Sequence, residues 1–328
     1  MLHAVTGADG FIGSHLVEAL VARGDRVRAL ALYNSAGTWG WLDTLAPDVL
    51  AEVEVVLGDV RDPEQMVNFC AGSDTVFHLG ALIAIPYSYA APRSYLETNA
   101  AGTLNVLEAV RRGGVRRMVH TSTSEVYGTA VRVPIDEEHP LQGQSPYSAS
   151  KIAADQMVEA FVRSFEVPAV TLRPFNTYGP RQSARAVIPT VISQIAAGQR
   201  EIRLGALDPT RDFNFVADTA AAFLAVGLGE DKLLGEVFNA GSGREVSIGD
   251  LVRTIAKVLD TEVEVRADED RFRPPGSEVM RLLADRSKLQ AATGWEPTWT
   301  LEQGLATTAE WFANPTNLSR YRPGDYAV

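Results

Sequence analysis

The sequence has few residues of several kinds, and each shortage excludes a class of protein. Its single cysteine, Cys70, allows neither an internal disulfide nor a thiolate metal cluster, which favours a reducing compartment. No apolar run approaches the roughly 18 residues that a membrane-spanning helix needs. The formal net charge of −11, without any cluster of Lys and Arg, disfavours nucleic acids and anionic membranes as partners. Met1 leads directly into an apolar segment with no room for a signal segment, so we expect a cytoplasmic, metal-free protein in which Cys70 packs within a helix.

The 328 residues, of which 46% are hydrophobic, suffice for one large or two moderate domains. Short apolar runs alternate with helical stretches, which is the pattern of a parallel sheet covered on both faces. The sequence therefore predicts an α/β protein with a doubly wound parallel sheet, the Rossmann fold. After a first strand near the N-terminus, the predicted strands are residues 27–32, 53–57, 75–79, 117–121 and 169–173.

A glycine-rich turn follows the first predicted strand. Its spacing is Gly7-x-x-Gly10-x-x-Gly13, and an apolar-periodic helix starts within it. Gly7 and Gly10 would let the backbone approach a pyrophosphate, and Gly13 would let the helix pack on its strand. The amide hydrogens and positive dipole end at the helix N-terminus, around Phe11 and Ile12, suit an anion. This segment predicts a dinucleotide-binding site.

The end of the second predicted strand lacks an acidic residue. Dinucleotide folds that prefer NAD place a carboxylate there for the ribose 2′-hydroxyl. The sequence at this point is Ala31-Leu32-Tyr33, and Arg28 lies within the strand. We expect NAD as the cofactor, with NADP left open.

Tyr147 and Lys151 are four residues apart in a predicted helix, so their side chains share one face. The lysine ammonium can lower the pKa of the phenol toward neutrality. A tyrosinate could then take a proton from a sugar hydroxyl, which lets the carbon beneath give its hydride to a nicotinamide. This spacing is common on ordinary helices and has weight only in the context of other motifs.

The chain as a whole resembles the extended short-chain dehydrogenase/reductase superfamily. The resemblance runs from about Leu2 to Phe312, and its glycine turn has the spacing described above. The further motifs follow in order: Gly58-Asp59-Val60, His78-Leu79-Gly80-Ala81, Asn99-x-x-Gly102-Thr103, Thr121 to Gly128, Tyr147-x-x-x-Lys151, Arg173 to Pro180, Arg211-Asp212-Phe213 and Asn239-x-Gly241-x-Gly243.

The resemblance implies roles for individual residues. The threonine at position Thr123 hydrogen-bonds the sugar 4-hydroxyl and assists Tyr147, Asp59 binds the adenine edge, and Asn176 donates to the β-phosphate. Arginines in the loops hold the diphosphate, for which guanidinium groups are suited. The implied cofactor contacts are Gly7, Gly10, Phe11, Ile12, Gly13, Asp59, Val60, Leu79, Gly80, Ala81, Asn99, Tyr147 and Lys151, and the implied substrate contacts are Tyr87, Asn176, Arg181, Arg185, Arg211 and Arg273.

Glu125 discriminates among the reactions of the superfamily. Once C4 of the sugar is a ketone, the C5 hydrogen is acidic, and a carboxylate can remove it while water leaves from C6 and hydride returns there. In 4,6-dehydratases that resemble this chain, the base is this glutamate and the preceding residue helps protonate the leaving oxygen. Here that residue is Ser124, so a water or Glu125 itself would serve as the acid. Simple 4-epimerases usually lack the glutamate, but UDP-glucuronate decarboxylases share Thr-Ser-Glu, so both remain alternatives.

Three segments bear on the substrate. Residues 33–43, 81–87 and 180–185 resemble the N-acetylglucosamine-nucleotide 4,6-dehydratases of legionaminic acid pathways. The resemblance implies UDP- or GDP-N-acetylglucosamine as the substrate and leaves the nucleotide base open.

The resemblance also implies the domain organisation. Residues 1–175 and 210–240 would form the dinucleotide-binding domain, and residues 176–209 and 241–313 a smaller α/β substrate domain. We expect the tail, residues 314–328, to be partly disordered because it is short, terminal and of mixed polarity. Helices around residues 100–112 and 147–165 would form the interface of a homodimer.

Overall fold

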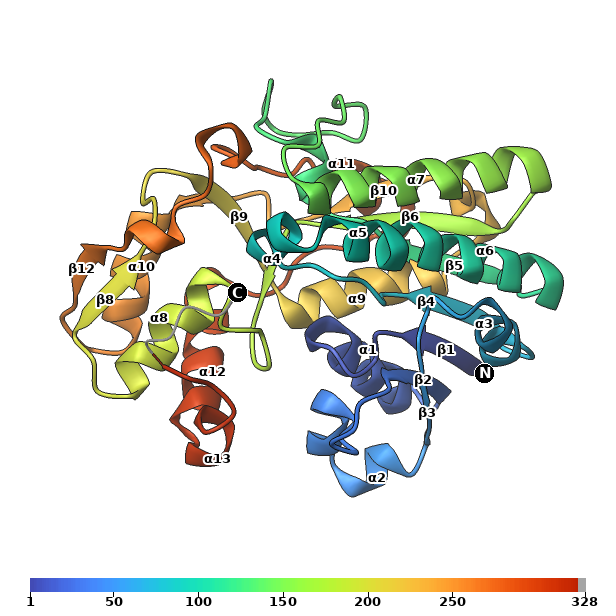
Figure 1. Ribbon diagram of the computed structural model, residues 1–328, viewed down its shortest axis with the longest axis horizontal. Coiled ribbons are helices and arrows are strands. Elements are labelled where there is room, and N and C mark those ends of the chain that lie inside the picture. The colour runs from blue at the N-terminus through green and yellow to red at the C-terminus, as the bar shows by residue number, and fades with distance from the viewer. Residues whose placement is uncertain (324–328) are drawn as a thin grey trace.

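The computed structural model describes residues 1–323 of the chain. Its largest element is a seven-stranded sheet in the order β10-β6-β5-β4-β1-β2-β3, in which all neighbours are parallel (Figure 1). This confirms the doubly wound fold, and the five strands expected after the first are present with ends shifted by at most one residue. The strands of this sheet are β1 (Leu2–Thr6), β2 (Arg26–Leu32), β3 (Val53–Gly58), β4 (Thr75–His78), β5 (Arg117–Thr121), β6 (Ala169–Pro174) and β10 (Val237–Ala240).

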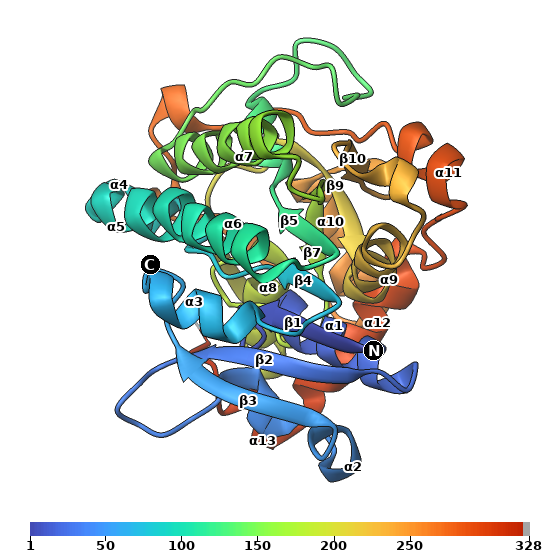
Figure 2. The ribbon, with the colours of Figure 1, turned by 90° about the vertical axis from the view of Figure 1, so that its right-hand side faces the viewer.

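Helices cover both faces of the sheet (Figure 2). On one face, α3, α6 and α7 enclose a core that includes Val106 and Met118 and the buried Cys70 of α3. On the other face, α1 and α9 enclose a core around Phe77 and Phe223. The helices of this larger part are α1 (Phe11–Ala22), α2 (Pro47–Leu50), α3 (Pro63–Cys70), α4 (Ile85–Ala90), α5 (Pro92–Tyr95), α6 (Gly102–Gly113), α7 (Pro146–Phe165), α9 (Val216–Gly227) and α11 (Ser287–Thr293), with short turns η1 (Gly40–Thr44), η2 (Leu96–Ala101), η3 (Ser124–Tyr127) and η4 (Asp231–Leu233).

The strand order reverses between β1 and β4. The two strands pair side by side, with Thr6 opposite His78. In open α/β sheets, ligands bind beyond the carboxyl ends of the strands at such a reversal. The fold therefore places the glycine turn after β1 and the segment after β4 at the expected position of a ligand.

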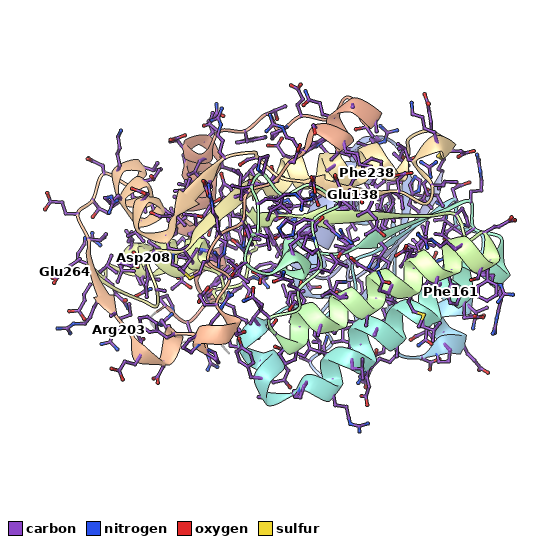
Figure 3. All side chains as sticks on the ribbon, turned by 90° about the horizontal axis from the view of Figure 1, so that it is seen from above. Glu138, Phe161, Arg203, Asp208, Phe238 and Glu264 are labelled. Atoms are coloured by element: carbon purple, nitrogen blue, oxygen red, sulfur yellow. The ribbon has the colours of Figure 1, made fainter. Side chains whose placement is uncertain are left out.

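A smaller part of the chain has its own core around Tyr178, Ile192 and Leu251. Figure 3 shows Arg203 and Glu264 at this end of the molecule, far from Phe161 of α7 at the other. Its elements are β7 (Asn176–Tyr178), β8 (Glu201–Leu204), β9 (Thr210–Phe215), β11 (Glu245–Ser247), β12 (Glu264–Ala267), α8 (Val187–Ala196), α10 (Ile248–Val258), α12 (Leu301–Ala313) and α13 (Pro315–Leu318), with η5 (Glu269–Arg271) and η6 (Pro275–Ser277).

The boundary near residue 210 differs in detail from the sequence prediction. Within the segment predicted to return to the large domain, α9 packs on the large sheet and β10 joins it. However, β9 pairs with β7 and β11 instead, in a three-stranded sheet. The alternating buried residues Phe213 and Phe215 explain this, because they belong to the smaller core. A second small sheet joins β8 to β12.

The start of the tail is ordered rather than disordered. Residues 315–318 form α13, and Tyr321 packs against Trp41 and Phe312 and donates a hydrogen bond to the carbonyl oxygen of Gln182, with an O–O distance of 2.9 Å. This aromatic packing offsets the entropy of ordering a terminal segment. The rest of the predicted tail, residues 324–328, lies outside the described residues. Within residues 1–323, no helix is both long and apolar enough to span a bilayer.

Candidate active site

The glycine turn brings the loops after β1 and β4 into direct contact. Gly7 has a φ of +66°, and a Cβ on it would lie 2.8 Å from the amide nitrogen of Gly80. A Cβ on Gly13 would lie 2.1 Å from the carbonyl oxygen of Gly7. Helix α1 begins at Phe11 with Gly10 as its N-cap, and no side chain caps it. Its first amide hydrogens are thus available to an anion, as a pyrophosphate requires.

Packing against Val60 explains why two further motif positions are glycine. Its side chain would lie 3.0 Å from a Cβ on Gly80 and 2.8 Å from one on Gly102, so any larger residue at either position would push it away. Leu79 and Ala81 flank Gly80 in the loop that this packing holds against the glycine turn, with the Leu79 amide donating to the Thr6 carbonyl oxygen.

The side chain of Asn99 forms hydrogen bonds within the protein. Its Oδ1 accepts a hydrogen bond from the amide of Leu82, and its Nδ2 donates to the carbonyl oxygen of Leu82 and to Oγ of Ser150. Asn99 is fully buried, so this side chain ties the loop after β4 to helix α7. A contact between its amide and the cofactor stays a prediction.

Asp59 lies at the end of β3, beyond Gly58, where the family position places the adenine edge. Its carboxylate is engaged by Arg61, whose Nη2 is 2.5 Å from Oδ2. The hydrogen bond from Arg61 lowers the pKa of Asp59. A contact of Asp59 with adenine stays a prediction, and the Arg61 side chain would share that position.

Strand β5 delivers Thr123, Ser124 and Glu125 into a short turn at its carboxyl end. Thr123 caps the turn by accepting a hydrogen bond from the amide of Glu125, with a distance of 3.2 Å. Ser124 and Glu125 are only 2% and 8% exposed. The carboxylate of Glu125 is therefore held inside the protein, at the edge of the sheet where the glycine turn also lies, rather than on the surface.

Tyr147 lies next to this turn, in the first turn of α7. Burial raises the pKa of Tyr147, a hydrogen bond with the Thr123 side chain opposes this rise, and the nearby charge of Glu125 adds to it. Tyr95 packs edge-on against the Tyr147 ring at a centroid distance of 6.2 Å. The fold thus brings Tyr147 of α7 close to Thr123 and Glu125, which lie in an earlier turn of the chain.

Lys151 is held by a backbone carbonyl oxygen of β5. Its Nζ donates to the carbonyl oxygen of Thr121 at 2.6 Å, and burial lowers the pKa of Lys151 to about 8, although the charge of Asp155 opposes the decrease. The prediction that its ammonium brings the Tyr147 pKa toward neutrality stays a prediction. In this structure the ammonium is bound by the carbonyl oxygen at the end of β5.

Asp155 is a neighbour of the site that the sequence analysis missed. It lies one further turn along α7, on the face of Tyr147 and Lys151, and this spacing was the signal that could have identified it. Its carboxylate accepts hydrogen bonds from Ser122 at 2.8 Å and from two nitrogens of Arg173 at 3.0 and 3.1 Å. His120 Nε2 lies 3.0 Å from its other oxygen. Asp155 fixes α7 to strands β5 and β6 directly behind the candidate catalytic residues.

Arg211 and Arg273 lie close together beside Glu278, as an anion-binding cluster would. Arg211, on β9, is buried and its Nη2 lies 3.1 Å from Oε1 of Glu278. Nη1 of Arg273 is 3.7 Å from the same oxygen and has no hydrogen-bond partner of its own. Burial lowers the pKa of Arg211, whereas the charges of Glu125 and Glu278 act to raise it. Glu278, which sequence reasoning also missed, compensates the two positive charges.

Arg181 does not lie with these arginines. It adopts a positive φ of 71°, and its guanidinium forms a two-pronged ion pair with Glu18 of α1 at 2.7 and 2.9 Å. This pair ties the loop after β7 to the helix that follows the glycine turn. An Arg181 contact with the diphosphate would require the ion pair to break.

Two of the three remaining predicted substrate contacts, Arg185 and Tyr87, lie near Tyr95. Arg185 is close enough for its charge to act on the pKa of Tyr95, which burial raises to about 12. The ring of Tyr87 lies 6.2 Å from that of Tyr95 and is 42% exposed. Asn176 has a buried Oδ1 without a hydrogen-bond partner among the described residues, as expected of an amide that serves a ligand.

These observations fit a dinucleotide. The backbone approach at Gly7, the uncapped N-terminus of α1 and the position at the strand-order reversal are what a pyrophosphate and its nucleosides need. In the part of the chain that the structure describes, no group of three or more His, Cys, Asp or Glu side chains could hold a metal ion.

The chain is similar to known 4,6-dehydratases and 4-epimerases over nearly its whole length. Residues 4–308 match the family described as GDP-mannose 4,6 dehydratase. A dTDP-glucose 4,6-dehydratase of Xanthomonas campestris pv. campestris is 34% identical over 99% of this chain and 97% of its own. A UDP-glucose 4-epimerase of Mycolicibacterium smegmatis is 33% identical over 94% and 98%. Among solved structures, a double mutant of the dTDP-glucose 4,6-dehydratase DesIV from Streptomyces venezuelae, with NAD and DAU bound, superposes with a TM-score of 0.86 at 29% identity, covering 96% of this chain and 98% of its own.

Proposed function

This chain belongs to the GDP-mannose 4,6 dehydratase family, and on that premise we propose that it is an NAD-dependent nucleotide-sugar 4,6-dehydratase acting on UDP- or GDP-N-acetylglucosamine. The single observation that carries the reaction type is Glu125. It is a buried carboxylate next to Tyr147 and Arg211, at the end of a central strand. An enzyme that only oxidises and reduces C4 needs no such second base.

The roles of the residues follow from their positions. Tyr147, whose pKa the neighbouring Thr123 side chain acts to lower, would take the proton of the sugar 4-hydroxyl. The nicotinamide, when bound, supplies the acceptor and later the donor of the hydride. Glu125 would remove the C5 proton, and the C6 oxygen would leave as water with a proton from Glu125 or a bound water, because Ser124 is a poor acid.

The arginines would hold the diphosphate. Arg211 and Arg273 face the same carboxylate oxygen of Glu278, and a diphosphate would be a second anion for them. Asn176, with its unpartnered amide oxygen, would flip its amide and donate to a phosphate oxygen.

The substrate assignment rests on the three segments that resemble N-acetylglucosamine-nucleotide dehydratases. Of these, residues 81–87 lead into α4, and Tyr87 lies near Tyr95, which contacts Tyr147. The relatives named above act on dTDP-glucose or UDP-glucose, so these sugars belong in the test.

Mass spectrometry of the products tests the function. The purified protein would be incubated separately with UDP-N-acetylglucosamine, GDP-N-acetylglucosamine, dTDP-glucose, UDP-glucose and UDP-glucuronate. We expect loss of one water from an N-acetylglucosamine nucleotide. Loss of water from dTDP-glucose alone would keep the reaction and overturn the substrate. Loss of carbon dioxide from UDP-glucuronate, or an isomer of unchanged mass, would overturn the dehydratase and favour the decarboxylase or the epimerase.

We also propose a homodimer formed through η2, α6 and α7. These helices lie side by side at the surface (Figure 2). Their outer face carries exposed apolar and small side chains: Leu96, Ala101, Ala149, Ala153, Met157 and Ala160. Burying such a face in a second copy would remove it from water.

Replacing Ala153 with arginine should convert the dimer to a monomer. A long charged side chain in the middle of a close helix contact would have to be buried without a partner. Light scattering after size-exclusion chromatography should change from twice 35.5 kDa to 35.5 kDa. The matched control is Ala291→Arg on the exposed side of α11, which should stay dimeric. A monomeric parent protein, or a dimeric A153R variant, would contradict this interface.

A further inference from the structure

The acid that the second strand lacks is supplied from the glycine turn. Asp9 lies between Gly7 and Gly10, and its Oδ2 accepts a hydrogen bond from the amide of Leu32 at 3.1 Å. Leu32 is the last residue of β2. A carboxylate therefore lies at the carboxyl end of the second strand, although the strand itself contributes none.

The residues at the end of β2 provide no carboxylate themselves. Ala31 is fully buried, and Leu32 and Tyr33 are apolar or aromatic side chains that are 55% and 69% exposed. None of the three offers an anion to a ribose. In dinucleotide folds, a carboxylate at this point accepts hydrogen bonds from the ribose and disfavours a 2′-phosphate.

The backbone of Asp9 is held from the opposite side by the segment after β2. Its carbonyl oxygen accepts a hydrogen bond from the amide of Trp41 at 3.0 Å. Gly40 makes this approach possible, because a Cβ there would lie 2.6 Å from that oxygen. Hydrogen bonds thus hold both the side chain and the backbone carbonyl of Asp9. This lowers the entropic cost of binding a ligand in one orientation.

Asp9 also has acceptor capacity to spare. A carboxylate can accept about four hydrogen bonds. Within residues 1–323, the donors to its carboxylate are the amides of Leu32 and of Asp9 itself. A cavity of about 250 Å³ opens at this side chain, lined by Asp9, Thr38, Gly40, Trp41, Asp43 and Arg320.

We propose that the Asp9 carboxylate binds the adenosine ribose of the cofactor, and that this contact makes the chain select NAD over NADP. The inference rests on the proposed function in that it takes a nicotinamide dinucleotide as the ligand. The two remaining acceptor positions suit the vicinal ribose hydroxyls, whereas a 2′-phosphate would place a second negative charge beside a partly buried carboxylate. Burial raises the pKa of Asp9, which reflects poor solvent screening at this position.

Titration of the full-length protein with NADH and NADPH, followed by nicotinamide fluorescence after removal of copurified nucleotide, tests this. The parent protein should bind NADH at least about 100-fold more tightly than NADPH, because hydrogen bonds to a charged group are lost and a repulsion is added. Asp9→Asn should weaken NADH about 10-fold to 100-fold and leave NADPH unchanged or tighter.

Asp74→Asn is the matched control. Asp74 accepts a hydrogen bond from the amide of Leu2 at 2.9 Å, which is the same kind of bond at the opposite edge of the sheet. This variant should bind both cofactors as the parent does, and circular dichroism should show both variants folded. The Asp9 side chain accepts from Leu32 equally well as an amide, so D9N is expected to fold.

Tighter binding of NADPH than of NADH by the parent protein would overturn the proposal and point to Arg320, which lines the same cavity, as the phosphate ligand. An unchanged cofactor preference in D9N would overturn it as well. Neither result depends on the sugar, because the titration contains none. Failure of the dehydratase assignment would instead appear in the product masses.

Discussion

Replacing Glu125 with glutamine is expected to reduce formation of the dehydrated product about 10²-fold to 10⁴-fold, the range that a general base contributes. The amide has the same shape but cannot accept the C5 proton. Tyr147, Thr123 and Lys151 are unchanged, so oxidation at C4 should still take place. The near-ultraviolet absorbance of the reduced nicotinamide should therefore appear on addition of sugar nucleotide and persist instead of decaying.

A second measurement separates this role from simple loss of structure. In heavy water, the parent enzyme should place deuterium at C5 of the product, and the Glu125→Gln variant should not exchange the C5 hydrogen of its substrate. Glu138→Gln is the control, because Glu138 is an exposed carboxylate on the segment that follows the same turn (Figure 3). Dehydration within a few-fold of the parent rate in the Glu125 variant would show that another group is the base.

The large sheet could be predicted from sequence because its strands are buried on both faces and read as continuous apolar runs. The ends of β2, β3, β4, β5 and β6 therefore fell within one residue of expectation. Strand β9 was less predictable. Its motif, Arg211-Asp212-Phe213, was recognised, but nothing local states that it pairs with β7 and β11 rather than with the large sheet.

The parts of the site that are formed by residues close together in sequence could be predicted. The glycine turn and the turn that carries Glu125 each lie within one loop, so their residue types and spacing suffice. Asp155 follows the same helical spacing and could have been found. Asp9 and Glu278 could not, because their roles depend on partners far away in the chain, Leu32 in one case and Arg211 and Arg273 in the other.

Lys151 also shows the limit of helical spacing. A shared face predicted its proximity to Tyr147, but the end of its long side chain is placed by the carbonyl oxygen of Thr121 and the charge of Asp155. The spacing along α7 predicts where the backbone of Lys151 lies. The burial and hydrogen bonding of its ammonium depend on β5, which the spacing does not describe. The buried charge of this lysine is therefore expected to cost stability, and we expect its role to be in activity.

Replacing Lys151 with methionine should lower activity, because the ammonium that is predicted to lower the pKa of Tyr147 is removed, and should stabilise the fold. Burial lowers the pKa of Lys151 from 10.5 to about 8, which corresponds to about 3 kcal/mol of destabilisation in the charged form. Methionine fills similar volume without charge but leaves the Thr121 carbonyl oxygen without its donor, at a cost of about 1 kcal/mol. The free energy of unfolding at pH 7 should rise by about 1–3 kcal/mol, while dehydration falls at least about 10²-fold.

The pH dependence of that stabilisation identifies its cause. A base whose pKa is lower in the folded state than in the unfolded state destabilises the fold fully below the folded pKa, and this penalty disappears as pH rises toward the unfolded value. The advantage of Lys151→Met over the parent should thus be largest below about pH 8 and shrink between pH 8 and 10.5. Lys257→Met, at an exposed position on α10, should change denaturant midpoints little at any pH. A Lys151 variant that is less stable than the parent at pH 7 would mean that the ammonium is held by more favourable interactions than its hydrogen bond to Thr121 and the charge of Asp155 supply.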